Sequence, residues 1–483
     1  MGKRALFSVY DKTGVVEFAR GLHELGWELL ASGGSAAALA AAELPVGPAS
    51  NYEGFGGRVK TLHAPLHAAI LARPEDAAEL AALGTSQIDL VAVNLYPFRE
   101  RPDVETIDIG GPSLLRGAAK NHARVTAICD PADYPAVLEE IRAAGDTSLE
   151  TRRSLAKKVF AHTGAYDAAI AAWLGADPLS FPEELALGWR KGAPLRYGEN
   201  PHQKAAVYLD ARGGLAAAQT LQGLPLSYNN LCDADAALDL VSAFSAPACV
   251  AVKHGGPCGV GLGQDAAEAF TRCQAADPVS IFGGVVAWNR PLDAAAVRAV
   301  GRQHLDVVLA PEVTEEARAA LKRKKNLRVL EVGAPTPADY RIRRINGGVL
   351  VQQQDFEPDA EWRVAAGPVP DWDALRFAWA ICRFVPSNAV VVSDSQQTFG
   401  VGGGQPNRVG AARIALAGAG DRARGAVAAT DGFCFPDTVE VLAEAGVTAL
   451  VEPGGSVQDA EVIATAEHLG FTLVLTGVRH FRH

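Results

Sequence analysis

Short apolar runs alternate with helix-like stretches over the first 130 residues. Residues 5–9, 27–31, 88–93 and 124–128 have the continuous apolar character of buried strands. Between the first two runs, Asp11 is a good N-cap for a helix whose apolar positions recur with a helical period. Alternating strands and helices of this kind predict βαβ units, and therefore a parallel sheet covered by helices.

An alanine-rich helical pattern follows from about residue 148 to residue 174. Glycine and proline then interrupt it at 175–182, and we place a domain boundary near residue 188. The predicted domains are therefore residues 1–188 and 189–483. The second domain also mixes strand and helix patterns, without a clear repeat, so both domains are assigned to the α/β class.

Composition narrows the class of protein. A chain of 483 residues with 48% hydrophobic and 21% charged residues is typical of a globular enzyme with two or three domains. The net charge of −10 disfavours a nucleic-acid-binding surface, and no apolar run reaches the length of a membrane span. Seven cysteines without a C-x-x-C pair predict neither a disulfide framework nor a paired-thiol zinc site, and favour the reducing cytoplasm.

Two glycine turns in the first domain indicate a phosphorylated ligand. Ser32, Gly33, Gly34 and Ser35 lie between a predicted strand and a helix, where backbone N–H groups and the helix dipole favour an anion. A second turn at 108–113 contains Gly110 and Gly111, and glycine and lysine recur at 56–61 and 119–122. Each turn alone is a common strand–helix connection, but together they favour phosphate binding.

Lys253 and His254 form an unusual pair in the second domain. Neighbouring residues of a strand point to opposite faces, so both could not serve one pocket within a strand. The predicted strand at 248–252 ends here, and Gly255, Gly256 and Pro257 follow, so a turn could direct both side chains to one site. The alternative interpretation is a surface turn with a solvated lysine.

Two other enzyme classes were compared with the sequence. Residues 261–266 match the degenerate dinucleotide pattern G-x-G-x-x-A, but a loop separates them from the preceding strand, which disfavours a nicotinamide-dependent dehydrogenase. A zinc deaminase needs P-C-x-x-C, whereas Pro257 and Cys258 are followed by Gly261 at the second cysteine position. No catalytic metal is predicted.

Taken together, the motifs resemble a known family nearly end to end. The family is that of the bifunctional purine-biosynthesis enzymes that combine aminoimidazole-carboxamide-ribonucleotide (AICAR) formyltransferase with inosinate (IMP) cyclohydrolase. The motifs that carry the likeness lie at 8–14, 56–63, 94–98, 107–112, 118–122, 195–203, 253–260, 387–389 and 479–483.

The resemblance implies a fold and a function for each domain. The first would have a methylglyoxal-synthase-like fold and close the ring of formylated AICAR (FAICAR) to give IMP. The second would consist of two cytidine-deaminase-like units without zinc, and would transfer a formyl group from the co-substrate 10-formyltetrahydrofolate to AICAR. A cytoplasmic homodimer and a structural potassium ion are also implied.

Site residues follow from the same likeness. In the first domain it implies catalytic roles for Lys60, Tyr96, Asp108 and Lys120, and substrate binding by Ser32, Gly33, Gly34, Ser35, Arg58, Thr61, Gly110 and Gly111. In the second it implies that His254 takes the amine proton, that Lys253 stabilises the oxyanion or protonates the leaving nitrogen, and that Asn388 orients the reactants. Substrate-binding residues there would be Arg196, Tyr197, Gly283, Asp306, Arg408, Phe433 and Arg479.

The sequence departs from the family pattern at a few positions. Tyr10 replaces the usual serine, and Pro386 stands where a lysine is usual. Pro406 and Asn407 replace the usual methionine or glutamine followed by serine, and the run 431–436 is one residue short, which affects the placement of Phe433. A non-catalytic purine-nucleotide sensor is the alternative function. Retention of Lys60, Lys120, Lys253, His254 and Asn388 disfavours it, because binding alone would not need this set.

Overall fold

The computed structural model describes residues 2–49, 59–175, 181–210, 213–333, 340–355 and 361–483. The predicted substrate-binding residue Arg58 lies outside them. The chain divides into two compact units, Met1–Arg190 and Lys191–His483. Within the described ranges, no helix has both the length and the apolar character needed to cross a membrane.

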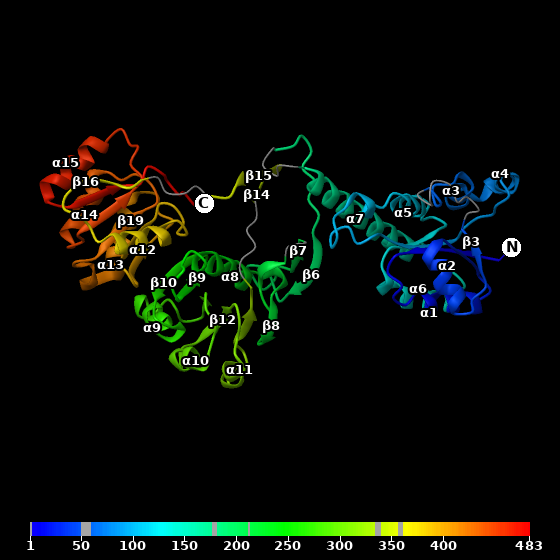
Figure 1. Ribbon diagram of the computed structural model, residues 1–483, viewed down its shortest axis with the longest axis horizontal. Coiled ribbons are helices and arrows are strands. Elements are labelled where there is room, and N and C mark those ends of the chain that lie inside the picture. The colour runs from blue at the N-terminus through cyan, green and yellow to red at the C-terminus, as the bar shows by residue number, and fades with distance from the viewer. Residues whose placement is uncertain (1, 50–58, 176–180, 211–212, 334–339, 356–360) are drawn as a thin grey trace. The chain divides into compact units, whose positions relative to one another are not determined.

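A five-stranded sheet forms the centre of the N-terminal unit (Figure 1, blue to teal). Its order is β3-β2-β1-β4-β5, and every neighbouring pair is parallel. The strands are β1 (Arg4–Val9), β2 (Glu28–Ala31), β3 (Val46–Pro48), β4 (Leu90–Asn94) and β5 (Thr126–Ile128). The predicted parallel α/β sheet is confirmed.

Helices cover both faces of this sheet. They are α1 (Val15–Glu24), α2 (Gly33–Ala41), α3 (Ala64–Leu71), α5 (Gly110–Lys120), α6 (Tyr134–Ala144) and α7 (Leu149–Leu174), whereas α4 (Ala77–Ala82) packs against α3. Alternate residues of β1 belong to two cores: Ala5, Phe7 and Val9 pack with α1, α2 and α6, whereas Leu6 packs with α3, α5 and α7. The strand period of two therefore builds a helix–sheet–helix sandwich.

The strand order places a crevice at the carboxyl ends of β1 and β4. Strands β2 and β3 extend the sheet on one side of β1, and β4 and β5 extend it on the other, so the winding reverses at β1. Ligands of open α/β sheets bind at such a reversal. Asn94, the last residue of β4, accepts hydrogen bonds from the N–H groups of Tyr10 (2.6 Å) and Asp11 (2.9 Å), just beyond β1.

Two six-stranded mixed sheets form the C-terminal unit, and they have the same topology. The first has the order β10-β9-β11-β12-β13-β8 and the second β18-β17-β19-β20-β21-β16. The first contains β8 (Gln219–Gln222), α8 (Tyr228–Val241), β9 (Ala248–Lys253), β10 (Gly256–Leu262), α9 (Ala266–Ala276), β11 (Gly284–Trp288), α10 (Ala294–Val300), β12 (Leu305–Ala310), α11 (Glu315–Leu321) and β13 (Arg328–Glu331).

The second sheet and its helices follow in the same order. They are β16 (Arg363–Ala366), α12 (Trp372–Cys382), β17 (Val390–Ser393), β18 (Thr398–Gly402), α13 (Arg408–Ala419), β19 (Val427–Thr430), α14 (Pro436–Glu444), β20 (Ala449–Glu452), α15 (Asp459–Leu469) and β21 (Thr472–Leu475). Each half is thus a hairpin, three parallel strands and an antiparallel edge strand. The structure therefore shows a repeat that the hydrophobic pattern of the second domain did not reveal.

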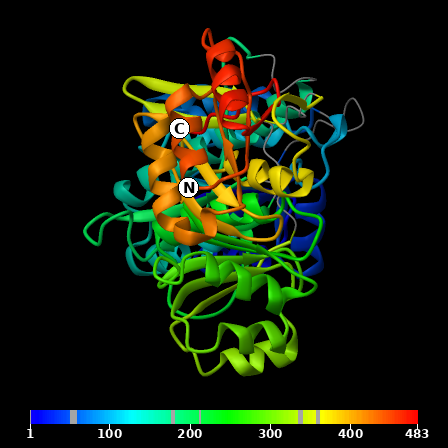
Figure 2. The ribbon, with the colours of Figure 1, turned by 90° about the vertical axis from the view of Figure 1, so that its left-hand side faces the viewer.

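One core joins the two halves of this unit. It contains buried residues of both sheets together with α8 and α12, for example Val250, Phe377, Trp379 and Val451. Helices α9–α11 cover the far face of the first sheet, and α13–α15 cover that of the second. The two halves, green and orange to red, can be followed in Figure 2. They form one folded body with a continuous interior.

Two hairpins lie outside the three large sheets. One joins β6 (Arg190–Leu195) to β7 (Ala205–Leu209), and the other joins β14 (Tyr340–Ile345) to β15 (Gly348–Gln353). Ile345, Val349 and Leu350 of the second hairpin are 43%, 50% and 55% exposed. A two-stranded hairpin that exposes apolar side chains is marginally stable by itself, so this one needs a covering surface.

Candidate active sites

Ser32 and Ser35 tie the start of α2 to β1. The hydroxyl of Ser32 lies 2.8 Å from that of Ser8. Ser35 is buried, and its hydroxyl accepts the N–H of Val9 (2.8 Å) and lies 3.1 Å from the carbonyl of Val9. The Ser35 hydroxyl is therefore occupied by the backbone of β1, and Ser32 is the more open of the two.

Two lysines approach the N-terminus of α2. A Cβ atom on Gly33 would lie 2.8 Å from Lys60 Nζ, and one on Gly34 would lie 3.7 Å from Lys12 Nζ. Gly33 has φ +47°, a left-handed conformation that glycine adopts readily. The ammonium of Lys12 also donates to the carbonyls of Val9 (2.6 Å) and Tyr10 (3.0 Å). Two cations beside a helix N-terminus make an anion site.

Lys12 was not among the predicted site residues. Burial is the main cause that lowers its pKa, and the charge of Asp11 opposes this shift. Its position three residues beyond the end of β1 is the signal that could have identified it, because the carboxyl ends of strands line this crevice.

Asp108 interacts electrostatically with both Lys60 and Tyr96. Burial raises the pKa of Asp108, while the N–H groups of Gly111 and Tyr96 and the charge of Lys60 lower it. Burial also raises the pKa of Tyr96, and the nearby Asp108 carboxylate adds to that shift. The Gly111 N–H donates to Asp108 Oδ1 at 2.8 Å. The structure therefore brings an ammonium, a phenol and a partly buried carboxylate together.

Gly110 and Thr61 touch at the start of α5. A Cβ atom on Gly110 would collide with Thr61 Oγ1, so glycine is needed for this close approach. Lys120, in contrast, is the last residue of α5, about 15 Å along the helix axis from Gly110 at 1.5 Å per residue. A catalytic role for Lys120 stays a prediction from the resemblance.

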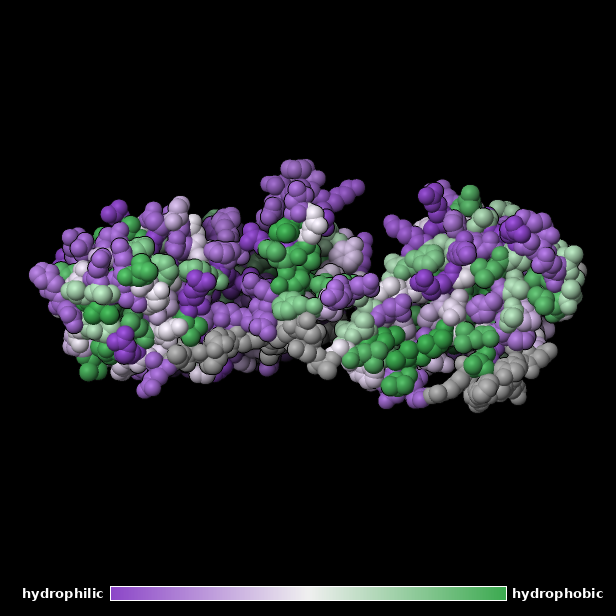
Figure 3. All heavy atoms as spheres, turned by 90° about the horizontal axis from the view of Figure 1, so that it is seen from above, coloured by the Kyte–Doolittle hydropathy of each residue, from purple (hydrophilic) through white to green (hydrophobic). Residues whose placement is uncertain are grey.

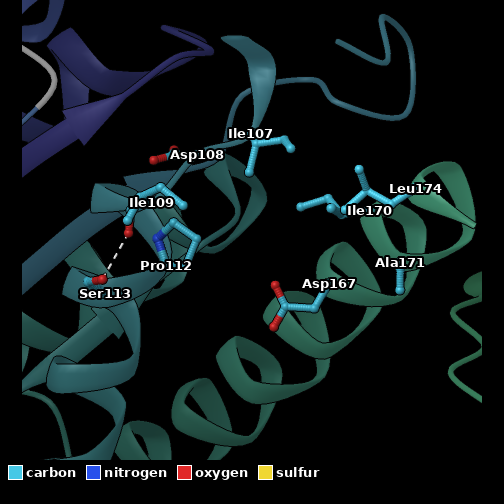
Figure 4. A pocket seen from close by; sticks show the side chains of 9 residues that line it. All are labelled: Ile107, Asp108, Ile109, Pro112, Ser113, Asp167, Ile170, Ala171 and Leu174. Atoms are coloured by element: carbon cyan, nitrogen blue, oxygen red, sulfur yellow. Dashed lines mark hydrogen bonds between the residues drawn. The ribbon is translucent and has the colours of Figure 1, made fainter. Parts of the chain in front are cut away.

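A cavity of about 440 Å³ opens between the start of α5 and the end of α7 (Figure 4). Its lining is mostly apolar and consists of Ile107, Asp108, Ile109, Pro112, Ser113, Asp167, Ile170, Ala171 and Leu174. The carboxylate of Asp108 points away from α7. Ile109 and Leu174 are 59% and 63% exposed. Hydrophobic residues also gather on the surface of this unit, on the right in Figure 3. The cavity therefore lies beside the Asp108 cluster, on the side of Asp108 that faces α7.

In the C-terminal unit, Lys253 and His254 occupy a tight hairpin turn. Lys253 ends β9 and pairs with Gly256, the first residue of β10, so His254 and Gly255 form a two-residue loop. Both have positive φ, +55° and +76°. This is the type I′ turn preferred in hairpins, in which a histidine is unusual at the first loop position. The turn removes the strand alternation that would separate the two side chains.

A carboxylate and a carbonyl hold this turn. Asp233 of α8 accepts the N–H of His254 (Oδ2, 3.3 Å) and that of Gly255 (Oδ1, 2.7 Å). The ammonium of Lys253 donates to the carbonyl of Phe282 at 2.7 Å. Sequence reasoning missed Asp233, because nothing in the helical pattern of α8 indicates that it reaches another element.

Gly283 and Asp306 lie next to this group. Gly283 has φ +72°, and its N–H donates to the carbonyl of His304 at 2.9 Å. His304 Nε2 lies 3.6 Å from Asp306 Oδ1, and the His304 ring lies 4.9 Å from that of Phe282. His304 thereby connects the predicted residues Gly283 and Asp306 to the loop that holds Lys253.

Arg196 and Tyr197 gather around Arg328. Burial is the main cause that lowers the pKa of Arg328, and the charges of Asp306, Tyr197 and Arg196 also act on it. The Arg196 guanidinium lies 5.4 Å from the centre of the Tyr197 ring. Arg328, which was not predicted, therefore links Arg196 and Tyr197 to Asp306.

A buried ion pair organises the chain around Asn388. Arg408 pairs with Asp431, and both side chains are almost fully buried. Asp431 also accepts the N–H of Ala389 (2.9 Å), while Arg408 donates to the Ala389 carbonyl (3.1 Å). The Asn388 amide donates to the carbonyl of Gln405 at 2.9 Å. In this arrangement the predicted ligand Arg408 holds the backbone beside Asn388 rather than standing open in a pocket.

Phe433 follows Gly432, which lies against Arg408 of this ion pair, and Arg479 lies against Phe481, which also borders Gly432. A Cβ atom on Gly432 would collide with both Arg408 and the ring of Phe481. Arg479 in turn lies 4.7 Å from the centre of the Phe481 ring. The shortened run at 431–436 and the end of the chain are thus in contact.

Strand register brings Asn388 to the same end as Lys253. Gly261 of β10 faces Gln397, just before β18, in antiparallel pairing. Because the two strands run antiparallel, the same register brings Gly256, at the start of β10, to the same end as Gly402, at the end of β18. Gly402 pairs with Val390, two residues after Asn388. The Lys253–His254 turn and Asn388 therefore lie at one end of two adjacent edge strands.

Comparisons with known proteins identify the family of the chain. The family model described as the AICARFT/IMPCHase bienzyme matches residues 118–418, and that of the MGS-like domain matches residues 14–112. Two curated relatives, from Halalkalibacterium halodurans (48% identical over 513 residues) and Desulfitobacterium hafniense (47% over 518 residues), are each called "Bifunctional purine biosynthesis protein PurH". Each match covers 100% of both chains.

A solved structure, described as the crystal structure of ForH, is 37% identical over 36% of this chain and 100% of its own, with a TM-score of 0.34. The family models and the full-length relatives together establish the relationship. The chain belongs to the AICARFT/IMPCHase bienzyme family.

Proposed function

We propose that this protein is a bifunctional enzyme that makes IMP in two steps, with one step in each unit. Formyl transfer to AICAR gives FAICAR, and dehydrative ring closure of FAICAR gives IMP. The observation that carries this proposal is the turn that holds Lys253 and His254 side by side, at the same end of the unit as Asn388. A nucleotide sensor would not need a cation and an imidazole on one strained loop.

We propose that the N-terminal domain, ending near residue 188, is the cyclohydrolase. The anion site formed by Gly33, Gly34 and Lys12 would hold the ribose phosphate. The nucleophilic amide and the formyl carbon are on one molecule, so holding them together removes much of the entropic barrier. Lys60 and Tyr96 are suited to polarise the formyl oxygen, and Asp108 to move protons as water leaves.

We propose that residues 189–483 carry the formyltransferase, with 10-formyltetrahydrofolate as co-substrate. The exocyclic amine of AICAR attacks the formyl carbon, a new C–N bond forms, and the bond from that carbon to the folate nitrogen breaks. His254 takes the amine proton, and Lys253 stabilises the oxyanion or protonates the leaving nitrogen. Asn388 lies at the same end of the unit to orient the reactants.

Single substitutions at the turn test this assignment. We expect His254→Ala to reduce formyl transfer by roughly 10²–10⁴-fold, the usual contribution of a positioned acid–base group. Lys253→Ala should cost about 10²–10³-fold, like the loss of one oxyanion donor. His468→Ala, an exposed histidine of α15, is the matched control. Single-turnover formyl transfer is measured beside IMP formation from FAICAR, which should stay normal. Transfer at the control rate in both variants would favour the sensor.

We also propose a cytoplasmic homodimer, with the β14–β15 hairpin packed against a second copy. Its exposed Ile345, Val349 and Leu350 support this assembly. All seven cysteines are free, as expected in a reducing compartment. Val349→Lys combined with Leu350→Lys should produce monomers in sedimentation equilibrium, and an unchanged dimer would exclude the hairpin as the contact. A structural potassium ion remains a prediction from the resemblance.

A further inference from the structure

We propose that Asp233 is a positioning residue for formyl transfer, which fixes His254 through the backbone rather than touching substrate. This inference rests on the proposed function of His254. Asp233 lies in the second turn of α8, and its carboxylate reaches the β9–β10 turn, 21 and 22 residues further along the chain. No helix-capping role explains it, because Ser227 and Asn230 cap α8.

The turn itself explains why such a residue is needed. His254 has φ +55°, a conformation that is costly for a residue with a Cβ atom. Asparagine, aspartate or glycine is the usual choice at this loop position, so a histidine there indicates a functional requirement. The energy that the strained residue costs must be offset by contacts elsewhere in the folded state.

Asp233 supplies those contacts. Successive N–H groups in a left-handed turn point into one concavity that binds anions. The two oxygens of Asp233 occupy it, one on the N–H of His254 and the other on that of Gly255 (3.3 and 2.7 Å). Hydrogen bonds to an ionised carboxylate are stronger than neutral ones. The carboxylate therefore selects the left-handed turn and with it the direction of the His254 side chain.

The test compares two carboxylates that hold hairpin turns. Asp394, at the turn between β17 and β18, accepts the N–H groups of Gln396 and Gln397, each at 2.7 Å, and lies at the end of β17 away from Asn388. We expect Asp233→Ala to lower the kcat of formyl transfer by roughly 10- to 100-fold, as misplacement of a catalytic group does. KM for AICAR should change little. Asp394→Ala should retain near-normal kcat, and both variants should still convert FAICAR to IMP.

A double variant distinguishes positioning from general loosening. In the His254→Ala background, Asp233→Ala should add no more than Asp394→Ala does, because Asp233 acts through His254. Asp233→Asn, whose amide oxygen can still accept from Gly255, should fall between wild type and Asp233→Ala, and it replaces Asp233→Ala if that variant does not fold.

The outcomes separate this inference from the function on which it rests. Equal kcat values for Asp233→Ala and Asp394→Ala would overturn the positioning role while leaving His254 as the base. So would an undiminished loss of kcat when Asp233→Ala is added to His254→Ala. Normal formyl transfer by His254→Ala would instead overturn the proposed function.

Discussion

Two residues with left-handed backbones, Gly33 and His254, lie at the two proposed sites and use that conformation differently. Gly33 has no side chain, so the ammonium of Lys60 can approach the start of α2. His254 keeps its side chain in the same region of φ, where Asp233 accepts its N–H. In both cases the left-handed backbone lets a functional group reach the site: the ammonium of Lys60 beside Gly33, and the imidazole of His254 itself.

Gly33→Ala should therefore impair IMP formation from FAICAR. The new Cβ atom would lie 2.8 Å from Lys60 Nζ, so it would crowd the proposed phosphate site and displace the lysine that would polarise the formyl oxygen. The matched control is Gly26→Ala, because Gly26 also has positive φ (+82°) but has no neighbour within 4 Å. Both variants should lose about 1–2 kcal/mol of unfolding free energy from the left-handed backbone. Steady-state cyclisation should show a raised KM for FAICAR and a lower kcat only in Gly33→Ala. Equal kinetic constants in the two variants would contradict the site at the start of α2.

At the scale of helices and strands, the sequence predicted those elements that a local pattern of apolar residues or glycines marks. The strand expected at 5–9 is β1, because a continuous apolar run with helices on both sides is buried on both faces. The turn after 248–252 was also predicted, because its glycines mark it. The two-unit organisation of the second domain followed only from the resemblance. The hydrophobic pattern did not reveal the repeat, since its edge strands β8 and β16 have only four residues each. So short a strand carries little periodicity.

The candidate sites were predictable to the extent that each residue lies in a recognisable motif. Lys12, Asp233 and Arg328 were missed, because each approaches a residue distant in sequence; for Lys12 this is Gly34 at the start of α2. Arg408 was recognised, but its buried pairing with Asp431 depends on tertiary packing that no local pattern encodes. Motifs identify residues near the chemistry, whereas the partners that position them follow from the fold.

One such tertiary contact predicts a pH dependence. Glu452, the last residue of β20, is buried and accepts the N–H of Cys434 at 2.7 Å. Burial is the main cause that raises its pKa from 4.5 to about 7; the N–H and thiol of Cys434 and the charge of Arg408 oppose the shift, and Asp459 adds to it. The folded state therefore holds this proton more tightly than the unfolded state. Its contribution to stability is fully present below pH 4.5 and is lost as the pH rises through about 7.

Urea unfolding of wild type and Glu452→Gln between pH 5 and pH 8 measures this contribution. The amide cannot ionise, so Glu452→Gln should lose less stability than wild type as the pH rises. Glu444→Gln, an exposed position on α14, should follow the wild-type curve. Parallel curves for wild type and Glu452→Gln would show that this carboxyl does not titrate within the range.

At the scale of the whole molecule, the chain is two bodies with separate interiors. The buried clusters of the N-terminal unit contain only its own residues, and those of the C-terminal unit begin with α8. A unit with its own core can fold alone, and a boundary between such units carries few contacts. The two proposed reactions are also independent, since only formyl transfer needs folate. Fusion of the two units therefore joins consecutive steps without requiring shared catalytic residues.

This independence predicts that residues 1–190, expressed alone, convert FAICAR to IMP without folate. The fragment contains both cores of the sheet, Lys12 and Lys60 beside α2, and the cluster of Tyr96 and Asp108. It should unfold cooperatively, and its kcat should be close to that of the full chain in an assay that separates FAICAR from IMP by chromatography. The same fragment with Lys60→Ala is the control and should fold but lose most of the activity. A fragment that folds but does not cyclise FAICAR would mean that the second unit, or a second copy of the chain, completes the site. Activity retained in the Lys60→Ala fragment would instead remove Lys60 from the proposed chemistry.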